Sequence, residues 1–397
     1  LEFRRVLFRS YAAMKRPGYE SDRQVLMLRD IATGQTRAVT ESWDRSVASI
    51  AWSPDGKSIY VTAQDTLDEP VFSIDVTSGK VTRLTQQGTA GNLVPLPQGG
   101  FVYSLNSIQF PDDFWVMSPK GKSWQATWAN KDRLADIDPV TVDRFSFAGA
   151  NGDTVWGQIV KPAGAKGPMP TMLLVHGGPQ GSFGNGWSYR WNPKAFAAHG
   201  LAAVTIDFHG STGYGQAFTD SINKDWGGKP LEDLKLGMAA AARRDPAVDP
   251  ANACAAGGSY GGYMMNWIAG KWNDGFKCLI QHDGVFDARA MAYETEELWF
   301  DEWEHGGPYY EQAEEYEKWN PVNHAQDWKT PMLVITGQND FRIPYTQGLA
   351  AFTALQRRDI PSKLLVYPDE NHWVLKPLNS MEWYREVFSW FDKWTAK

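Results

Sequence analysis

Two patterns of hydrophobic residues divide the chain near residue 140. Beyond that point, short apolar runs alternate with longer segments in which apolar residues recur at helical spacing. The runs predict buried strands and the longer segments predict helices. Strands are expected at 142–148, 154–161, 170–175, 201–207, 252–257, 277–282, 331–336 and 363–367, and helices at 190–199, 230–244, 260–270, 345–357 and 378–394. We expect the first two strands to pair antiparallel. The alternation after them is typical of a doubly wound, mostly parallel sheet in an α/β protein.

Residues 11–135 carry a different pattern, in which short strand-like runs are separated by turn residues. Asp30–Gly34 returns as Asp75–Gly79, a period of 45 residues. Between them, Pro54-Asp55-Gly56 predicts a turn between two strands. Four short strands in about 40–45 residues is the period of a propeller blade. We therefore expect a truncated all-β propeller of two to three blades, where a closed ring has roughly four to eight. A plain series of hairpins is the alternative.

The ends of these regions are marked by composition. The polar stretch 130–141 ends in Asp138-Pro139 and is a candidate linker, which places the α/β domain at 136–397. Residues 1–10 have neither an initiating Met nor the apolar core and cleavage site of a signal peptide. We interpret them as a leader foreign to the natural protein. The leader and the small number of blades together predict that the chain is a piece of a longer protein.

A segment rich in Trp, Tyr and Glu, 285–328, interrupts the alternation where an active-site lid or pocket wall is expected. Its acidic side chains could meet the amine of a substrate. The interpretation that we favour is a solvated helical face. The residues concerned are Glu294, Glu296, Glu297, Glu302 and Glu304.

Composition excludes several classes of function. The net charge of −7 offers no electrostatic basis for binding nucleic acid. No apolar run reaches about 18 residues, so neither a transmembrane helix nor a membrane partner is expected. Zinc-site spacing and a phosphate-binding glycine loop are both missing, so no metal and no cofactor is predicted. Cys254 and Cys278 lie in apolar strand-like runs. That setting favours buried free thiols over a disulfide.

The candidate chemistry begins with the G-x-S-x-G stretch Gly257–Gly261, which lies between an apolar run and a helical run. This context is that of a nucleophile elbow, whose turn is so tight that the flanking residues must lack side chains. The serine hydroxyl is then exposed at the edge of the sheet. Ser259 is therefore the predicted nucleophile, although the five residues alone would also fit a glycine-rich turn.

An acid and a base follow the serine in the order Ser…Asp…His that this kind of site requires. Asp340 follows the strand at 331–336, and His372 follows the strand at 363–367. The carboxyl ends of parallel strands share one edge of the sheet, where open sheets build their sites. We predict that His372 takes the proton of Ser259 and that Asp340 orients the imidazole. The rival acids are Asp283, Asp287 and Asp369.

An oxyanion hole needs backbone N–H groups directed at the developing negative oxygen. Tyr260, the residue after the nucleophile, is expected to supply one of them. The other is expected from the loop His176–Pro179, which follows the strand at 170–175. Gly177 and Gly178 permit a close approach of the backbone. The same loop would also fit an ordinary turn.

Five motifs in this order resemble the prolyl oligopeptidase family of serine peptidases. They are His176–Pro179, Gly210–Gly215, Gly257–Tyr263, Asp340–Pro344 and Asn371-His372. The resemblance is dense over 142–397 and loose over 11–135, and it points to the branch of dipeptidyl-peptidase V and acylaminoacyl-peptidase. It implies that Arg342 contacts substrate, with a structural ion pair as the alternative.

His176 departs from part of this family. The prolyl oligopeptidase and dipeptidyl-peptidase IV branches are known for a tyrosine hydroxyl in the oxyanion hole. Because this chain has His176 at the start of the loop, the backbone of Gly177 or Gly178 is expected to serve instead. The departure argues against strict cleavage after proline.

The residues and the resemblance together predict a serine exopeptidase with a C-terminal α/β-hydrolase domain. It would hydrolyse peptide bonds near the N-terminus of short peptides, as a dipeptidyl-peptidase. An acylaminoacyl-peptidase and a carboxylesterase with the same triad are the alternatives, and a propeller-based binding protein is the alternative outside the enzymes. Short peptides are the expected partners, and a homodimer stays open. The resemblance favours a periplasmic or secreted protein over a cytoplasmic one.

Overall fold

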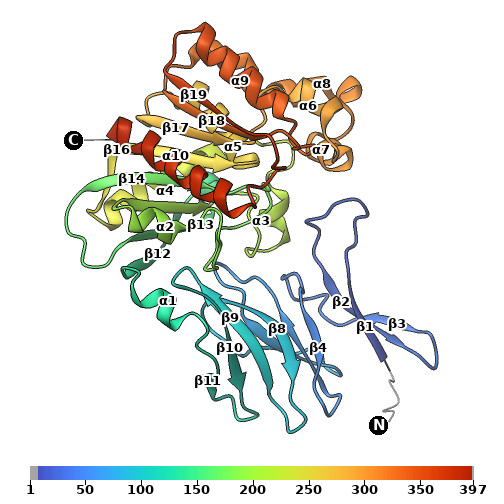
Figure 1. Cartoon of the computed structure of the whole chain (residues 1–397). Helices are drawn as coiled ribbons and strands as arrows, with labels where there is room; N and C mark the ends of the chain where they lie inside the picture. Colours follow the sequence, from blue (N-terminus) through green and yellow to red (C-terminus); the bar gives the residue numbers. More distant parts are fainter. Residues whose placement is uncertain (1–7, 396–397) are drawn as a thin grey trace. The chain divides into compact units, whose positions relative to one another are not determined.

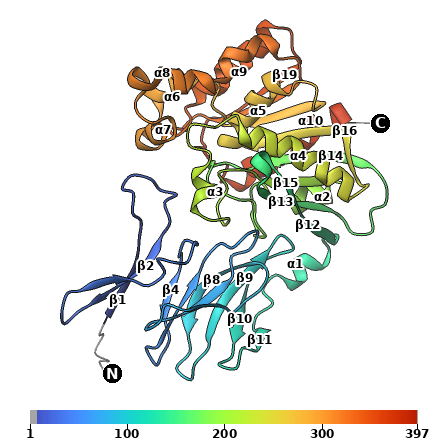
Figure 2. The same ribbon diagram turned by 180° about the vertical axis from the view of Figure 1, so that it is seen from behind.

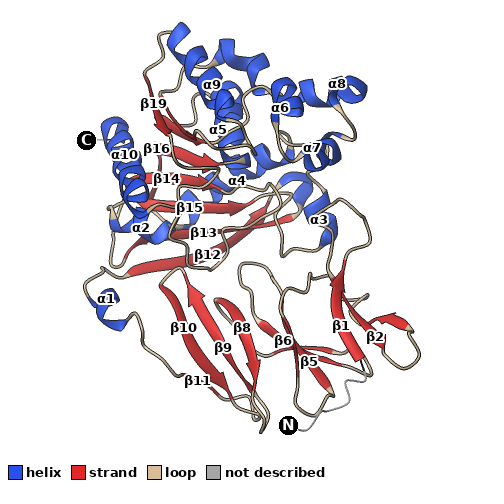
Figure 3. Cartoon of the chain, turned by 45° about the vertical axis from the view of Figure 1, so that its right-hand side comes forward, coloured by secondary structure: helices blue, strands red, loops and turns tan. Residues whose placement is uncertain are grey.

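The structure, a computed structural model, describes residues 8–395. The chain divides into two compact units. The first contains the chain up to Ile137 with the segments 184–188 and 212–217, and the second contains the rest of the chain from Asp138 onward. Figure 3 shows mainly strands and loops in the first unit, whereas helices and strands alternate in the second.

Over residues 8–137, the first unit is built from three small antiparallel sheets. Two strands flank the Pro54-Asp55-Gly56 turn, as predicted. Phe8–Ser10 begin the first strand, whereas the other residues of the predicted leader, 1–7, lie outside the described residues. The sheets are β1 (Phe8–Ala13), β2 (Val25–Asp30) and β3 (Thr36–Ala38); β4 (Ile50–Trp52), β5 (Ser58–Thr62), β6 (Val71–Asp75) and β7 (Val81–Arg83); and β8 (Thr89–Pro95), β9 (Phe101–Ser107), β10 (Phe110–Met117) and β11 (Ser123–Gln125).

The two copies of the 45-residue repeat form turns of the same kind. The first turn joins β2 to β3, and the second joins β6 to β7. The carboxylates of Asp30 and Asp75 each accept a hydrogen bond from the backbone N–H three residues further on, at 2.8 and 2.7 Å. Gly34 and Gly79 have φ near +73° and +71°, where side chains are disfavoured. The repeated Asp and Gly are therefore the residues that this turn requires.

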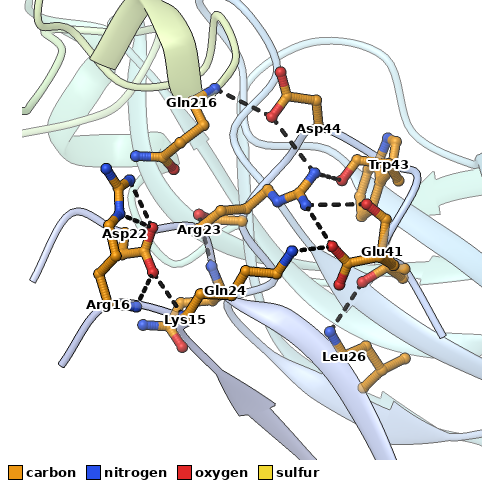
Figure 4. A network of polar contacts seen from close by, with 12 residues as sticks. Lys15, Arg16, Asp22, Arg23, Gln24, Leu26, Glu41, Trp43, Asp44 and Gln216 are labelled. Carbon is orange, nitrogen blue, oxygen red and sulfur yellow. Dashed lines mark hydrogen bonds and ion pairs between the residues drawn. The ribbon is translucent and has the colours of Figure 1, made fainter. Parts of the chain in front are cut away.

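A polar network holds the segment between β1 and β2 (Figure 4). Asp22 accepts hydrogen bonds from the backbone N–H of Lys15 and of Arg16 at 2.6 and 2.7 Å, and from the Arg16 guanidinium at 2.7 Å. Arg23 donates to two backbone carbonyls of the segment 41–43 at 3.0 Å. Burial disfavours the charged form of Asp22, but the hydrogen bonds from Arg16 and Lys15 outweigh it and lower the pKa of this carboxyl.

The second unit is built around an eight-stranded sheet in the order β12-β13-β15-β14-β16-β17-β18-β19. β12 and β13 pair antiparallel, and the strands from β14 to β19 run parallel. The predicted strands are therefore confirmed, with ends that differ by a few residues. They are β12 (Val140–Ala148), β13 (Thr154–Pro162), β14 (Met169–Val175), β15 (Ala202–Asp207), β16 (Val248–Gly258), β17 (Cys278–His282), β18 (Met332–Gly337) and β19 (Ser362–Tyr367).

Helices cover both faces of this sheet. The chain steps from β14 to β15 in one direction and from β15 through β19 in the other. Because crossovers between parallel strands are right-handed, the connecting helices fall on opposite faces. Figure 1 shows α2 (Pro193–Ala198) and α10 (Pro377–Thr395) in front of the sheet, and Figure 2 shows α4 (Lys229–Arg244) and α5 (Tyr260–Lys271) in front of it from behind. α9 (Tyr345–Arg357) packs on β18 and β19.

The insert 285–328 forms α6 (Ala288–Glu294), α7 (Leu298–His305), α8 (Tyr309–Lys318) and the 3₁₀ helix η2 (Pro321–Asp327). The helices α1 (Lys131–Ala135) and α3 (Gln216–Asp220) and the 3₁₀ helix η1 (Ala150–Gly152) were not predicted, because fewer than two turns carry no measurable period. Among the helices of residues 8–395, none combines the length and the apolar composition that crossing a bilayer requires.

The prediction of two free thiols is wrong. Cys254 and Cys278 lie directly opposite each other on the neighbouring strands β16 and β17, with their Cα atoms 4.7 Å apart, and form a disulfide. The sequence pattern placed both residues in strands. It could not place them side by side, because the register of two parallel strands depends on the helix that connects them.

Candidate active site

Ser259 occupies the turn between β16 and α5, with φ +60° and ψ −123°. A residue other than glycine is strained in this region, so the surrounding structure must hold it. The N–H of Ser259 donates to the carbonyl of His282 at 3.0 Å, and the Ser259 carbonyl accepts from the N–H of Tyr263 at 2.9 Å. The sharp turn from strand to helix that the motif predicts is therefore present.

The glycines of the motif allow the elbow to touch two other strands. A Cβ atom added to Gly261 would lie 2.2 Å from the carbonyl oxygen of Val175, at the end of β14. One added to Gly262 would lie 2.3 Å from the carbonyl oxygen of His282, at the end of β17. Both neighbours are backbone atoms, so no side-chain rotation could make room. Glycine is therefore required here by contact.

Asp340 and His372 are in direct contact. Asp340 lies in the loop after β18 and His372 in the loop after β19, and the distance from His372 Nδ1 to Asp340 Oδ2 is 2.7 Å. The other carboxylate oxygen of Asp340 accepts from the N–H groups of Arg342 and Ile343, each at 2.9 Å. An ionised Asp340 accepts only, so Nδ1 carries the proton and Nε2 of the neutral ring is unprotonated.

Opposing effects act on the charge of His372. Burial disfavours the imidazolium, but the hydrogen bond with Asp340 and the negative charges of Asp283 and Asp340 outweigh burial and the nearby Arg342. The net result is a raised pKa for His372. This environment suits a base that becomes positively charged during a reaction.

The three predicted residues lie at one edge of the sheet, because Ser259, Asp340 and His372 follow the parallel strands β16, β18 and β19. Neighbouring strands are about 4.8 Å apart, so loops of modest length span this edge. Gly337, the last residue of β18, lets the loop before His372 pass closely: a Cβ atom there would lie 2.2 Å from the carbonyl oxygen of Asn371.

The loop after β14 lies against the elbow. A Cβ atom added to Gly177 would be 3.0 Å from the Cβ atom of Ser259. His176 anchors this loop, since its Nδ1 and Nε2 lie 2.8 Å from the carbonyl oxygen of Gly177 and from Oγ of Ser211. Burial lowers the pKa of His176 to about 4, against the effect of the Gly177 carbonyl, so the ring is neutral.

Two sources of backbone N–H groups therefore border Ser259. Tyr260 is the first residue of α5, and the first N–H groups of a helix have no partner within it. Gly177 is the second source, and its neighbour Gly178 has φ +124°, a conformation that favours glycine. That Tyr260, Gly177 and Gly178 form an oxyanion hole stays a prediction.

Arg342 connects the loop after β18 to the insert. Its guanidinium lies 2.8 Å from the carboxylate of Glu297, just before α7. The guanidinium carbon is also 5.2 Å from the ring centre of Trp373, the residue after His372. The structural ion pair that was the alternative for Arg342 is thus present, and a contact with substrate stays a prediction.

Of the five glutamates considered in the insert, Glu304 departs most from a solvated face. Glu304 is fully buried, and its two oxygens accept hydrogen bonds from Nε2 of Gln180 and Nε1 of Trp226, each at 2.7 Å. Burial raises the pKa of Glu304 to about 7, although both hydrogen bonds act in the other direction. The solvated interpretation is therefore wrong for Glu304. It is confirmed for Glu294 and Glu302, which are exposed helical residues. Glu296 and Glu297 lie between α6 and α7, the first exposed and the second half-buried.

Two of the rival acids are engaged elsewhere: Asp287 caps α6 and Asp369 pairs with Lys376. Asp283 instead lies beside His372, with 4.0 Å between its Oδ2 and Nδ1. Asp283, Asp340 and His372 also form the cluster, among residues 8–395, whose ligand atoms lie within 4.8 Å of one another and could hold a metal ion. A cation there would have to displace the proton that joins Asp340 to His372.

The sequence of the second unit shows the family to which the chain belongs. The sequence profile of the prolyl oligopeptidase family matches residues 187–397, and the chain belongs to this family. The resemblance noted from the motifs is therefore confirmed.

Two curated relatives match almost the whole of this chain. Dipeptidyl-peptidase 5 of Schizosaccharomyces pombe is 36% identical over 392 residues, covering 97% of this chain and 57% of the relative. Dipeptidyl-peptidase 5 of Porphyromonas gingivalis is 34% identical over 395 residues, covering 98% and 58%. The chain thus spans somewhat more than half the length of these relatives. An acylaminoacyl peptidase of Pyrococcus horikoshii shares the fold, with a TM-score of 0.88 at 22% identity over 98% of this chain and 62% of that one.

Proposed function

We propose that this chain is a serine peptidase of the dipeptidyl-peptidase type, with Ser259, His372 and Asp340 as its catalytic residues. The observation that carries the proposal is the pair of Asp340 and His372, 2.7 Å apart, at the sheet edge where Ser259 is held in a strained turn. A strained serine at the same sheet edge as a base that a carboxylate orients is typical of sites that activate a hydroxyl as a nucleophile.

The residues supply each step of acyl transfer. Oγ of Ser259 attacks the peptide carbonyl while Nε2 of His372 takes its proton, and the new positive charge is stabilised by Asp340. The N–H groups of Tyr260 and of Gly177 or Gly178 receive the negative oxygen. His372 then returns the proton to the leaving amine, and water releases the acyl group by the same route.

We infer further that the second unit is an α/β-hydrolase domain and that the three small sheets are propeller blades. The mostly parallel sheet with helices on both faces supports the first inference. Sheets of three or four antiparallel strands, two of them carrying the same Asp…Gly turn, support the second.

The relatives named dipeptidyl-peptidase 5 favour substrates with a free N-terminal amine. The disulfide between Cys254 and Cys278 favours an oxidising compartment, and hence a periplasmic or secreted protein. An acylaminoacyl-peptidase remains the second candidate, because the solved structure with that name shares the fold.

A fluorophosphonate probe and a substrate panel test these proposals. Ser259→Ala should abolish labelling and lower turnover by on the order of 10⁴–10⁶, because the triad acts as a unit. Dipeptidyl amides with free and acetylated N-termini then separate the substrate classes. Acetylation should reduce kcat/KM by an amount that corresponds to about 2–5 kcal/mol. Labelling that persists in Ser259→Ala refutes the site, and equal rates on both substrates favour the esterase.

A further inference from the structure

Asp283 is placed beside the candidate base by a strained backbone. It is the first residue after β17, between the strands that precede Ser259 and Asp340. Its φ of +47° is unusual for a residue with a side chain, and its N–H is fixed by the carbonyl of Ile335 at 3.0 Å. In this conformation its Oδ2 lies 4.0 Å from Nδ1 of His372.

Within residues 8–395, the surroundings of Asp283 account for one of its two carboxylate oxygens. It is 3% exposed, and within residues 8–395 its Oδ1 has no hydrogen-bond partner. Its Oδ2 pairs with Nε2 of His282 at 2.8 Å. A buried carboxylate with an unpaired oxygen destabilises the fold, so its presence indicates a function.

Among the described residues, few charged groups act on His372 and Asp283. Asp340, Asp283 and Arg342 act on His372, while His282, His372 and Asp340 act on Asp283. Burial raises the pKa of Asp283, and the two histidines oppose this rise. A positive charge on His372 therefore favours an ionised Asp283, and an ionised Asp283 in turn favours the positive charge.

We propose that Asp283 is a positioning residue, a second carboxylate that stabilises the protonated His372 formed when Ser259 gives up its proton. The proposal rests on the function proposed above for Ser259 and His372. The proton moves from Oγ of Ser259 to Nε2 of His372, so the ring gains one positive charge. Asp340 meets this charge through a hydrogen bond at 2.7 Å, and Asp283 meets it at 4.0 Å without one.

The test is the pH dependence of the rate at which a small fluorophosphonate labels Ser259 in the whole chain. This reaction needs the neutral His372 but no particular peptide, so it is independent of substrate preference. In Asp283→Asn, the mid-point of the acid limb should fall by about one pH unit, because a negative charge near the imidazole is lost. The plateau rate should also fall, by at most about tenfold, because a base that is weaker by one pKa unit accepts the proton of Ser259 less readily.

Two further variants make the result decisive. Asp233→Asn is the matched control, because Asp233 is a buried aspartate that contacts Nδ1 of His209 at 2.6 Å, within the same unit. It should not move the mid-point. Asp283→Gly suits the positive φ and should reproduce the shift if Asp283→Asn does not fold.

The outcomes distinguish the two proposals. A mid-point that stays in place in the folded Asp283 variants, or that moves equally in Asp233→Asn, overturns the role of Asp283 while Ser259→Ala remains unlabelled. Labelling of Ser259→Ala at the normal rate would instead overturn the proposed function itself.

Discussion

Replacing Glu304 by Gln should stabilise the second unit at neutral and alkaline pH. The carboxyl of Glu304 is buried, with a pKa raised from 4.5 to about 7. A carboxyl whose pKa rises on folding holds its proton more tightly in the folded state, so stability falls as the pH passes from the lower value to the higher one. Glutamine has no such ionisation. Both hydrogen bonds can persist, because the Gln180 amide can turn over to accept while Trp226 still donates.

The size of the effect follows from the pKa. A rise from 4.5 to about 7 corresponds to about 3 kcal/mol at pH 8 and to less than about 1 kcal/mol at pH 5. For a unit of this size, a change of about 3 kcal/mol raises Tm by roughly 6 °C or more. Glu304→Gln should therefore unfold at a clearly higher temperature than the wild type at pH 8 and at a similar temperature at pH 5.

Thermal unfolding of both proteins at pH 5, 6, 7 and 8 measures this difference. Glu302→Gln is the control, because Glu302 lies on the same helix with an exposed side chain and should leave Tm almost unchanged at every pH. A Glu304→Gln protein that is less stable than the wild type at pH 8 would refute the reasoning. So would a stabilisation of equal size at pH 5 and pH 8.

Two further predictions concern a close contact and a charge. Gly337→Ala should lower the fluorophosphonate labelling rate by about 10². The added Cβ atom would lie 2.2 Å from the carbonyl oxygen of Asn371, so the loop of His372 must move by about 0.8 Å to bring this distance to at least 3.0 Å. In the control Gly348→Ala, the added Cβ atom meets side-chain atoms at 3.3 Å or more, so most of the rate should remain. Asp22→Asn should destabilise the first unit by about 1–3 kcal/mol at pH 7, seen as faster proteolysis before residue 137. The depressed pKa of Asp22 supplies stability above about pH 4 that is lost as the pH falls through the folded value, so the gap to the wild type should narrow in acid.

The central strands of the second unit could be predicted because each contains a short apolar run that both faces of the sheet bury. β15 and β18, for example, are buried along their whole length. What the pattern could not provide was register. The disulfide between Cys254 and Cys278 depends on the alignment of β16 with β17, which is a property of the folded sheet and not of either strand alone.

The candidate site was visible for a related reason. Ser259, Asp340 and His372 each follow a predicted strand, so the topology of the sheet brings their loops to one edge. The burial of Glu304 was not visible, since its partners Gln180 and Trp226 come from other parts of the chain. Asp283 could be named as a rival acid, but its distance from His372 depends on a positive φ that the sequence does not reveal.

The geometry of the site is set by backbone contacts more than by side chains at its rim. At Gly261, Gly262 and Gly337, an added Cβ atom would come within 2.2 or 2.3 Å of a carbonyl oxygen on a neighbouring loop or strand end. These contacts fix the loops that carry Ser259 and His372 relative to one another. Interiors this tightly packed transmit a displacement instead of absorbing it. Substitutions at the three glycines should therefore impair the reaction more than loss of the ion pair of Arg342. This holds even though glycine has no side chain for a substrate to contact, whereas the side chain of Arg342 is partly exposed.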